Sequence, residues 1–313
     1  FYHLYENETD SDVTLLVGQE GWQERIPAHS WVLANGSDYF RALFTGHFAD
    51  PPTRVHTFPD DPKGFNNLIR WLYQNRCDLQ SLQCSLDTLH VAIKYLCPDL
   101  AERCIIQLTR QINVSNVLKV LRWIYCYCSN YQPSVPSAPS QEEFERDVVD
   151  CQKDPTTSCQ LLLNQCLQLI DQYSDEVLKS EHLSIADPPV LNMVLKRDTL
   201  NLSSELKIMK ALHKWSTDTC KRKHLPLTLE NRRKTLGSLL YLPRLLTISV
   251  SESEQMSSKQ GESFRLLTQE ELSFIDAYVR RASLPPVPET MKEHITAMSI
   301  PRKQEQLSSC SKA

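Results

Sequence analysis

The change in hydrophobic periodicity along the chain is the feature that most restricts its fold. Within the first 60 residues, short segments alternate polar and apolar side chains, most clearly at Val13, Leu15 and Val17. Farther on, apolar residues recur at helical spacing, beginning with Phe65 and Leu68. Alternation predicts half-buried strands, and spacing of three to four residues predicts amphipathic helices. We therefore expect an α+β domain to about residue 110, followed by an all-helical domain.

Individual elements can be placed within these two regions. A Gly-bounded turn at 18–21 joins residues 12–18 and 22–26 in a predicted β-hairpin, and residues 54–58 are a third strand. Thr268, followed three residues later by Glu271, predicts a capping box at a helix start. Helical patterns cover residues 29–33, 37–44, 65–72, 86–96, 100–108, 115–125, 160–182, 188–196, 203–220, 229–242 and 268–282.

Three segments interrupt the helical pattern. Residues 129–159 contain four prolines, three of them at Pro133, Pro136 and Pro139, and several serines, which predicts an exposed insertion that is mobile and dispensable. Residues 249–263 are rich in Ser, Glu and Gln and are predicted to be a polar loop. Residues 286–313 begin within the Pro-Pro-Val-Pro sequence at 285–288 and have no periodicity, so we expect a disordered tail.

Charge and hydropathy exclude several functions. The 313 residues include 34 Lys and Arg against 38 Asp and Glu, for a net charge of −4. A surface that binds duplex DNA or anionic lipid needs a basic excess, so we expect neither nucleic acid nor membrane as a partner. No apolar run approaches the roughly 18 residues that a membrane span requires. The chain starts at Phe1 without a signal peptide, and residues of a longer protein are expected before it.

The cysteines and basic runs bear on location. There are 11 cysteines, an odd number, and several lie within apolar helical patterns. Buried thiols of this kind predict a reducing compartment. We therefore expect a cytoplasmic protein, with the nucleus as a second location that the same argument allows. The runs Lys221–Lys223 and Arg232–Lys234 have two interpretations, localisation signals or solvated helix surfaces.

We find no pattern that predicts catalysis or a cofactor. With seven glycines there is no Gly-rich phosphate loop, and no Gly-x-Ser-x-Gly sequence is present. No Cys-x-x-Cys pair supports a zinc site, and the seven-residue spacings Cys77–Cys84 and Cys97–Cys104 favour core packing over metal binding. The expectation is a protein without enzymatic activity, cofactor or metal, whose function is to bind other proteins.

A set of spaced motifs carries a more specific resemblance. "SDVTLLVG", "RIPAHSWVLANGSDYFRALFTG", "RVHTFPDD" and "NLIRWLYQNRCDL" follow one another in the order seen in BTB/POZ domains. The resemblance covers residues 1–110. Residues 111–285, through "CLQLIDQYSDEVLKSE" and "VLKRDTLNLSSELKIMKALHKWSTDTC", resemble a BACK domain, closest to the branch in which a PHR β-sandwich follows. The chain stops about where that PHR domain would begin.

The resemblance implies a scaffold, most often a substrate adaptor of a cullin-3 ubiquitin ligase. Such proteins bind the N-terminal domain of cullin-3 through the BTB domain and hold a protein substrate elsewhere. The substrate of this chain is not indicated by its sequence. The family's cullin contact, apolar-x-Glu, corresponds here to Phe48, Ala49 and Asp50, and Tyr73 matches a family tyrosine on the same face. Residues 111–127 match the three-box helical pair that extends the cullin groove. The alternative for Phe48 is plain core packing.

The resemblance also implies a homodimer, with departures that predict a weak one. Leu4, Tyr5, Asp10 and Asp12 fall on the family's dimer face, and Asp10 stands where an apolar residue is expected. Burying an unpaired carboxylate costs several kcal/mol. In BTB transcription factors Asp12 pairs with a Lys or Arg, and Ser30 occupies that position here. Corepressor binding is therefore disfavoured, and the competing function is a cullin-independent BTB scaffold in cytoskeletal or transcriptional assemblies.

Overall fold

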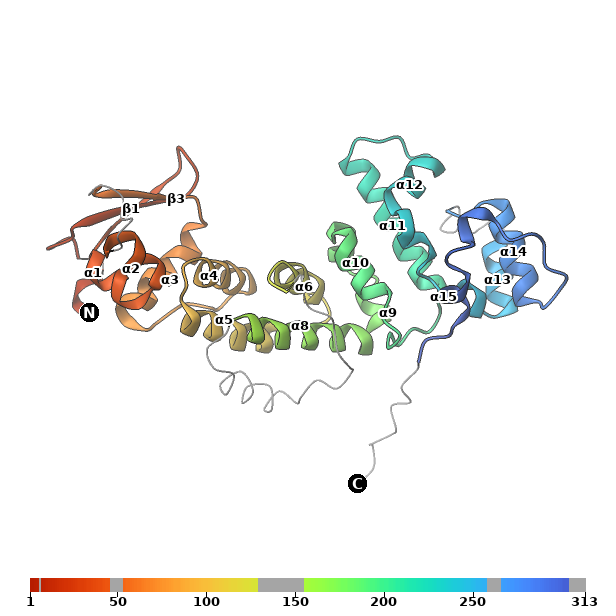
Figure 1. Cartoon of the computed structure of the whole chain (residues 1–313), viewed down its shortest axis with the longest axis horizontal. Helices are drawn as coiled ribbons and strands as arrows, with labels where there is room; N and C mark the ends of the chain where they lie inside the picture. Colours follow the sequence, from red (N-terminus) through yellow and green to blue (C-terminus); the bar gives the residue numbers. More distant parts are fainter. Residues whose placement is uncertain (6, 46–52, 129–154, 258–265, 304–313) are drawn as a thin grey trace, which may run out of the picture. The chain divides into compact units, whose positions relative to one another are not determined.

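The computed structural model describes residues 1–5, 7–45, 53–128, 155–257 and 266–303. Within these residues the chain forms two compact units (Figure 1). The first contains residues 1–112 together with 127–128 and 155–164, and the second contains 113–126, 165–257 and 266–303. The predicted insertion lies outside the described residues over 129–154, as does the tail over 304–313.

A small mixed sheet forms one side of the first unit. Its strands are β1 (Val13–Val17), β2 (Glu24–Ala28) and β3 (Val55–Phe58), in the order β2-β1-β3. β1 is antiparallel to β2 and parallel to β3. The predicted hairpin and third strand are confirmed. β1 alternates as its sequence requires, because Val13, Leu15 and Val17 are buried while the residues between them are only half-buried.

Helices make up the rest of the first unit (Figure 1). The side chain of Asp61 caps the start of α3 by accepting from the amides of Lys63 and Gly64, and Ser81 caps α4 in the same way. Gly64 is required by close packing, because a Cβ there would lie 2.8 Å from the backbone of Asp87. The elements are η1 (Tyr2–Leu4), α1 (Ser30–Gly36), α2 (Asp38–Thr45), α3 (Pro62–Gln74), α4 (Leu82–Lys94) and α5 (Pro98–Gln111).

An aromatic cluster lies at the centre of the first unit. The ring of Tyr95 stacks on Phe40 at a centroid distance of 5.7 Å and meets Phe65 edge-on at 5.4 Å. Burial raises the pKa of Tyr95, and its hydroxyl donates to Asp60, which also accepts from Lys94 at 2.8 Å. The aromatic rings therefore fix α2, α3 and α4 around one buried carboxylate.

The second unit is built from helices. Trp215 is buried in its core, and the indole N–H donates to the carbonyl oxygen of Ala186 at 2.9 Å. α8 begins in the first unit and ends in the second. The elements are α6 (Val117–Tyr125), α8 (Pro155–Gln172), α9 (Ser174–Val177), η2 (Glu181–Ile185), α10 (Pro188–Leu195), α11 (Leu206–Arg222), α12 (Leu229–Leu236), η3 (Gly237–Tyr241), η4 (Leu245–Thr247), α13 (Val250–Ser257), α14 (Gln269–Val279), η6 (Glu289–Met291) and α15 (Ile295–Ser299).

Capping explains one confirmed helix start and one missed helix. The predicted capping box of Thr268 and Glu271 begins α14. α13 occupies most of the described part of the predicted polar loop at 249–263. Ser249 and Glu252 form a reciprocal pair there: the Glu252 amide donates to the Ser249 hydroxyl at 3.3 Å, and the Glu252 carboxylate accepts from the Ser249 amide at 2.8 Å. The loop prediction was wrong because this capping pair offsets the polar composition.

The structure also differs from the predicted disorder over residues 286–303. Met291 and Met298 are fully buried. Arg302 donates to Glu205 at 2.7 Å, and the Lys303 amide donates to the Asp198 carbonyl oxygen at 2.9 Å. The order of this segment comes from contacts with distant residues, which leave no local period in the sequence.

Candidate interaction surface

Tyr73 lies at the centre of the residues that the sequence singles out. It is on α3, is 5% exposed, and its hydroxyl accepts from the backbone N–H of His29 at 2.8 Å. The same hydroxyl lies 2.9 Å from Nδ1 of His29, whose Nε2 lies 3.0 Å from the carbonyl oxygen of Thr9. Burial raises the pKa of Tyr73 to about 12. A neutral phenol and a neutral imidazole protonated at Nε2 satisfy all of these contacts.

Asp12 and Ser30 meet beside this histidine. The carboxylate of Asp12 accepts from the Ser30 amide at 2.7 Å and from the Ser30 hydroxyl at 2.5 Å. Partial burial alone raises the pKa of Asp12, but these hydrogen bonds outweigh burial and lower the pKa below its usual value. A serine thus takes the place of the expected cation, and the interaction is a capping contact at the start of α1.

The other predicted dimer-face residues lie in the N-terminal segment. Leu4 ends η1, and the ring of Tyr5 lies 6.0 Å from the ring of Tyr73. Asp10 is exposed and has a φ of 63°. Aspartate tolerates this left-handed conformation better than most residues, because its short polar side chain can bond locally. The role that the structure gives Asp10 in the fold is therefore conformational.

Of the predicted cullin contacts, Tyr73 is the one that lies within the described residues. Tyr73 contacts Tyr5 and His29, and so lies with the predicted dimer-face residues. Phe48, Ala49 and Asp50 lie outside the described residues, between the end of α2 at Thr45 and the start of β3.

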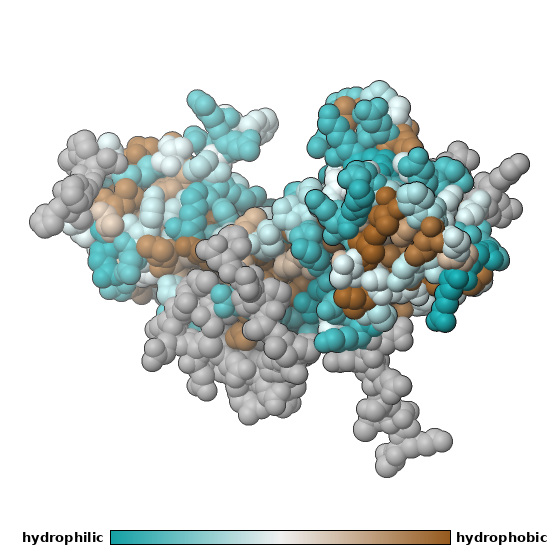
Figure 2. Space-filling model, turned by 45° about the vertical axis from the view of Figure 1, so that its right-hand side comes forward, coloured by the Kyte–Doolittle hydropathy of each residue, from teal (hydrophilic) through white to brown (hydrophobic). Residues whose placement is uncertain are grey.

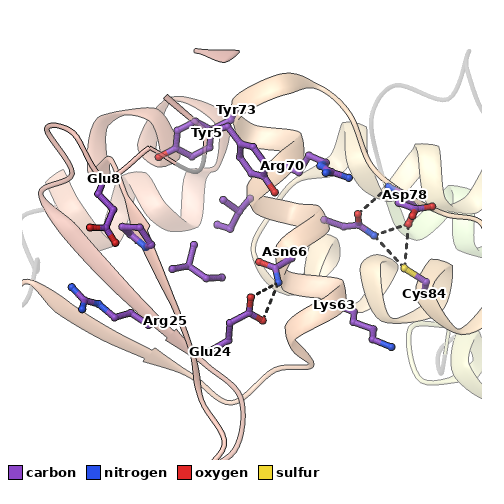
Figure 3. Close-up of a pocket in the computed structure, with 14 residues that line it drawn as sticks. Tyr5, Glu8, Glu24, Arg25, Lys63, Asn66, Arg70, Tyr73, Asp78 and Cys84 are labelled. Atoms are coloured by element: carbon purple, nitrogen blue, oxygen red, sulfur yellow. Dashed lines mark hydrogen bonds between the residues drawn. The ribbon is translucent and has the colours of Figure 1, made fainter. Parts of the chain in front are cut away.

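A cavity of about 580 Å³ opens next to Tyr73 (Figure 3). It lies between the N-terminal segment, β2 and α3, and Tyr5 and Tyr73 stand together at one end of it. Asn66 donates to both carboxylate oxygens of Glu24 at 3.1 Å, which joins α3 to β2. Charged side chains of both signs and the rings of Tyr5 and Tyr73 line the cavity.

Asn67 is a structural residue that the sequence analysis missed. Its side chain accepts from the Asp78 amide at 2.9 Å and donates to the Asp78 carbonyl oxygen at 2.7 Å. It also donates to the Thr88 hydroxyl at 2.9 Å. These bonds fix the connection between α3 and α4. A lone asparagine within a helical pattern carries no sequence signal for this role.

The described residues contain no metal-binding group, no disulfide and no membrane-spanning helix. Across these residues, no three His, Cys, Asp or Glu side chains are grouped so that they could hold a metal ion. The nine cysteines in these ranges are free thiols. Among the described helices, none combines the length and the apolar character of a membrane span.

Family models match both units of the chain. The model described as the BTB/POZ domain matches residues 1–112, and the one described as "BTB And C-terminal Kelch", or BACK, matches residues 155–246. The mixed sheet with its helices and the helical region that follows are the folds that these two matches require.

Curated relatives match most of the chain. It is 29% identical over 282 residues to BTB/POZ domain-containing protein 6 of Xenopus laevis, which covers 90% of this chain and 46% of that protein. The mouse protein of the same name is 30% identical over 249 residues, or 80% of this chain and 40% of the relative. Human BTB/POZ domain-containing protein 3 is 28% identical over 258 residues, or 82% and 43%. The chain thus spans less than half the length of these relatives. With both family models matched, it is a BTB/POZ and BACK domain protein.

Proposed function

We propose that this protein is a substrate adaptor of a cullin-3 ubiquitin ligase. BTB domains mediate protein–protein interaction, and here one is followed by a BACK domain in the same chain. The observation that carries the proposal is the sequence Phe48-Ala49-Asp50, which stands where this family has its apolar-x-Glu contact. In this assignment the BTB domain extends to about residue 110 and the BACK domain to about 285, with α6 in the 111–127 segment that extends the cullin groove.

Phe48 is the proposed anchor of the contact. Pro51 and Pro52 follow it and cannot continue a helix from α2, which favours an exposed corner. An aromatic residue at such a corner loses little conformational entropy on binding. Asp50 keeps the charge of the family's glutamate but is one methylene shorter, and it acts at the rim. Tyr73 acts indirectly, since its buried hydroxyl holds His29 in place.

Calorimetry tests the proposal. The full chain is titrated with the N-terminal domain of cullin-3, alongside Phe48→Ala and Asp50→Glu variants. Truncating a central aromatic anchor costs about 2–4 kcal/mol, or roughly 30- to 1000-fold in affinity. Replacing Asp50 with Glu is expected to change affinity by less than about tenfold, and to raise it if the shorter acid is a handicap.

The outcomes separate the function from the site. If the wild type shows no binding at high micromolar concentration, the adaptor function fails and a cullin-independent scaffold in cytoskeletal or transcriptional assemblies replaces it. If Phe48→Ala binds as tightly as the wild type, the function stands and the site assignment fails.

A weak homodimer is part of the same proposal. Leu4, Tyr5, Asp10 and Asp12 form the assigned dimer face, and a charge at the core of an obligate interface is unfavourable. Because Asp10 has a positive φ, replacing it with Leu would strain the backbone. Asp10→Asn removes the charge and keeps the backbone conformation. It is the variant of choice for sedimentation measurements, where we expect it to tighten dimerisation.

A further inference from the structure

A second cavity, of about 560 Å³, lies at the C-terminal end of α3. Its wall combines the last turn of α3, the connection to α4, one residue of η1 and one residue of α5. Three arginines line it: Arg70 from α3, Arg76 from the connection and Arg103 from α5. Asp78 is the acidic residue of the lining. The whole chain has a net charge of −4, so this basic concentration is local.

The three guanidinium groups have no acidic partner in the part of the first unit that the structure describes. Ion pairs among the described residues of that unit include Arg41 with Asp38 and Lys94 with Asp60, and no arginine of the cavity takes part in one. The carboxylate of Asp78 accepts from the Gln80 amide at 3.2 Å, a local turn contact. Like charges that share a cavity repel one another, and an anion bound between them would relieve that repulsion.

Aromatic rings hold two of these arginines in place. Arg76 lies over the ring of Tyr2 at 5.5 Å, and Arg70 lies over the ring of Tyr5 at 5.7 Å. In Figure 3 the Arg70 side chain extends away from Glu24 and Arg25, towards the side where Asp78 lies. Contacts with ring faces orient a guanidinium without neutralising it. The donors are thus positioned in advance, which lowers the entropic cost of binding a ligand.

The chemistry of the lining selects an oxyanion. Guanidinium groups present paired N–H donors in a planar fork that matches a carboxylate or a phosphate. Gln74 and Gln80 add neutral amide donors to the same wall. The volume is within the range of cavities that hold a ligand of side-chain size or larger. A neutral or cationic group would leave the repulsion between the arginines in place.

We propose that this cavity binds an oxyanion presented by a peptide of a partner protein, on a phosphorylated or an acidic side chain. The three arginines bind the anion, and Tyr2 and Tyr5 are positioning residues. The site is separate from the segment at 48–50, and anion binding does not depend on cullin-3.

Fluorescence anisotropy of the full chain distinguishes the two sources of the anion. Three labelled peptides share one neutral sequence and differ at the centre, which carries a serine, a phosphoserine or three glutamates. We expect one anionic peptide to bind at least about tenfold more tightly than the serine peptide at low salt, with weaker binding at higher salt. Phosphoserine binding alone indicates a phosphopeptide site, and glutamate binding alone indicates an acidic-peptide site.

Matched variants test whether the arginines are responsible. Arg76→Gln with Arg103→Gln is expected to lower the affinity for the bound peptide about tenfold or more, while Arg103→Lys retains part of it. Arg54→Gln is the control, because Arg54 is exposed on the same unit and does not line the cavity. Thermal melting of each variant confirms that it is folded. The proposal is overturned if neither anionic peptide exceeds the serine peptide, or if Arg54→Gln weakens binding as much as the double variant.

Discussion

Arginines of the two units differ in whether a carboxylate pairs with them. In the second unit, Arg233 donates to both carboxylate oxygens of Glu271 at 2.8 Å and to the Tyr241 hydroxyl at 2.9 Å. Glu271 is fully buried and also accepts from Thr290 at 2.6 Å. In the first unit, three arginines line one cavity, and none of them forms an ion pair with a carboxylate among the described residues.

This difference separates two uses of the same side chain. A partly buried guanidinium that donates to a buried carboxylate and to the Tyr241 hydroxyl joins elements that are distant in sequence, here α12, η3 and α14. Thr290 joins η6 to the same carboxylate. An arginine whose positive charge is not paired with a carboxylate contributes little to the stability of the fold, and its guanidinium can bind an external anion. On the face shown in Figure 2, hydrophilic residues border hydrophobic ones.

Breaking the buried pair should have the largest effect. We expect Arg233→Ala to lower the free energy of unfolding of the second unit by about 3–5 kcal/mol, because Glu271 is left as a buried and uncompensated charge. The neighbouring Lys234→Ala removes an exposed charge and should stay within about 0.5 kcal/mol of the wild type. Urea denaturation followed by circular dichroism measures both. Equal effects of the two variants would contradict a structural role of the pair.

Acid should break the same ion pair by protonating Glu271. Burial alone raises the pKa of Glu271, but hydrogen bonds from Arg233, Thr290 and the Thr268 amide outweigh it and lower the pKa from 4.5 to about 2. Because the folded-state pKa is the lower one, the stabilisation is complete above pH 4.5 and is lost as the pH falls towards 2. The shift corresponds to about 3 kcal/mol.

Thermal unfolding of the wild type and of Glu271→Gln across this pH range measures the effect. The variant is expected to be less stable at neutral pH and to lose less stability on acidification. Parallel curves for the two proteins would show that another group controls acid unfolding.

The smallest effect on stability is expected at the cavity. Arg76→Gln with Arg103→Gln should change the free energy of unfolding by less than about 1 kcal/mol, since a ring contact of an exposed arginine contributes about 0.5–1 kcal/mol. The urea assay used for Arg233→Ala provides a direct comparison. A loss of several kcal/mol would place these arginines in the same structural class as Arg233 and remove the contrast between the units.

Local patterns in the sequence were sufficient for most of the fold. The alternation of Val13, Leu15 and Val17 predicted β1, and the capping box of Thr268 and Glu271 predicted the start of α14. Both signals lie within one element. α13 also had such a signal, the Ser249 and Glu252 pair, but its polar composition favoured a loop.

The contacts between distant residues could not be predicted in this way. The run Arg232–Lys234 was interpreted as a localisation signal or a solvated surface, yet Arg233 pairs with a carboxylate 38 residues away. Tyr73 was assigned to a cullin contact by resemblance, and its hydroxyl bonds to His29, 44 residues earlier. The cavity arginines come from three separate elements, so no motif unites them.

The most direct test of the adaptor function is quantitative mass spectrometry of proteins that co-purify with the full chain from cells. Wild type and Phe48→Ala are purified in parallel, with Arg54→Gln as the surface control. We predict that cullin-3 is enriched with the wild type and the control, and is depleted about 30-fold or more with Phe48→Ala. Absence of cullin-3 from the wild-type preparation would contradict the proposed function.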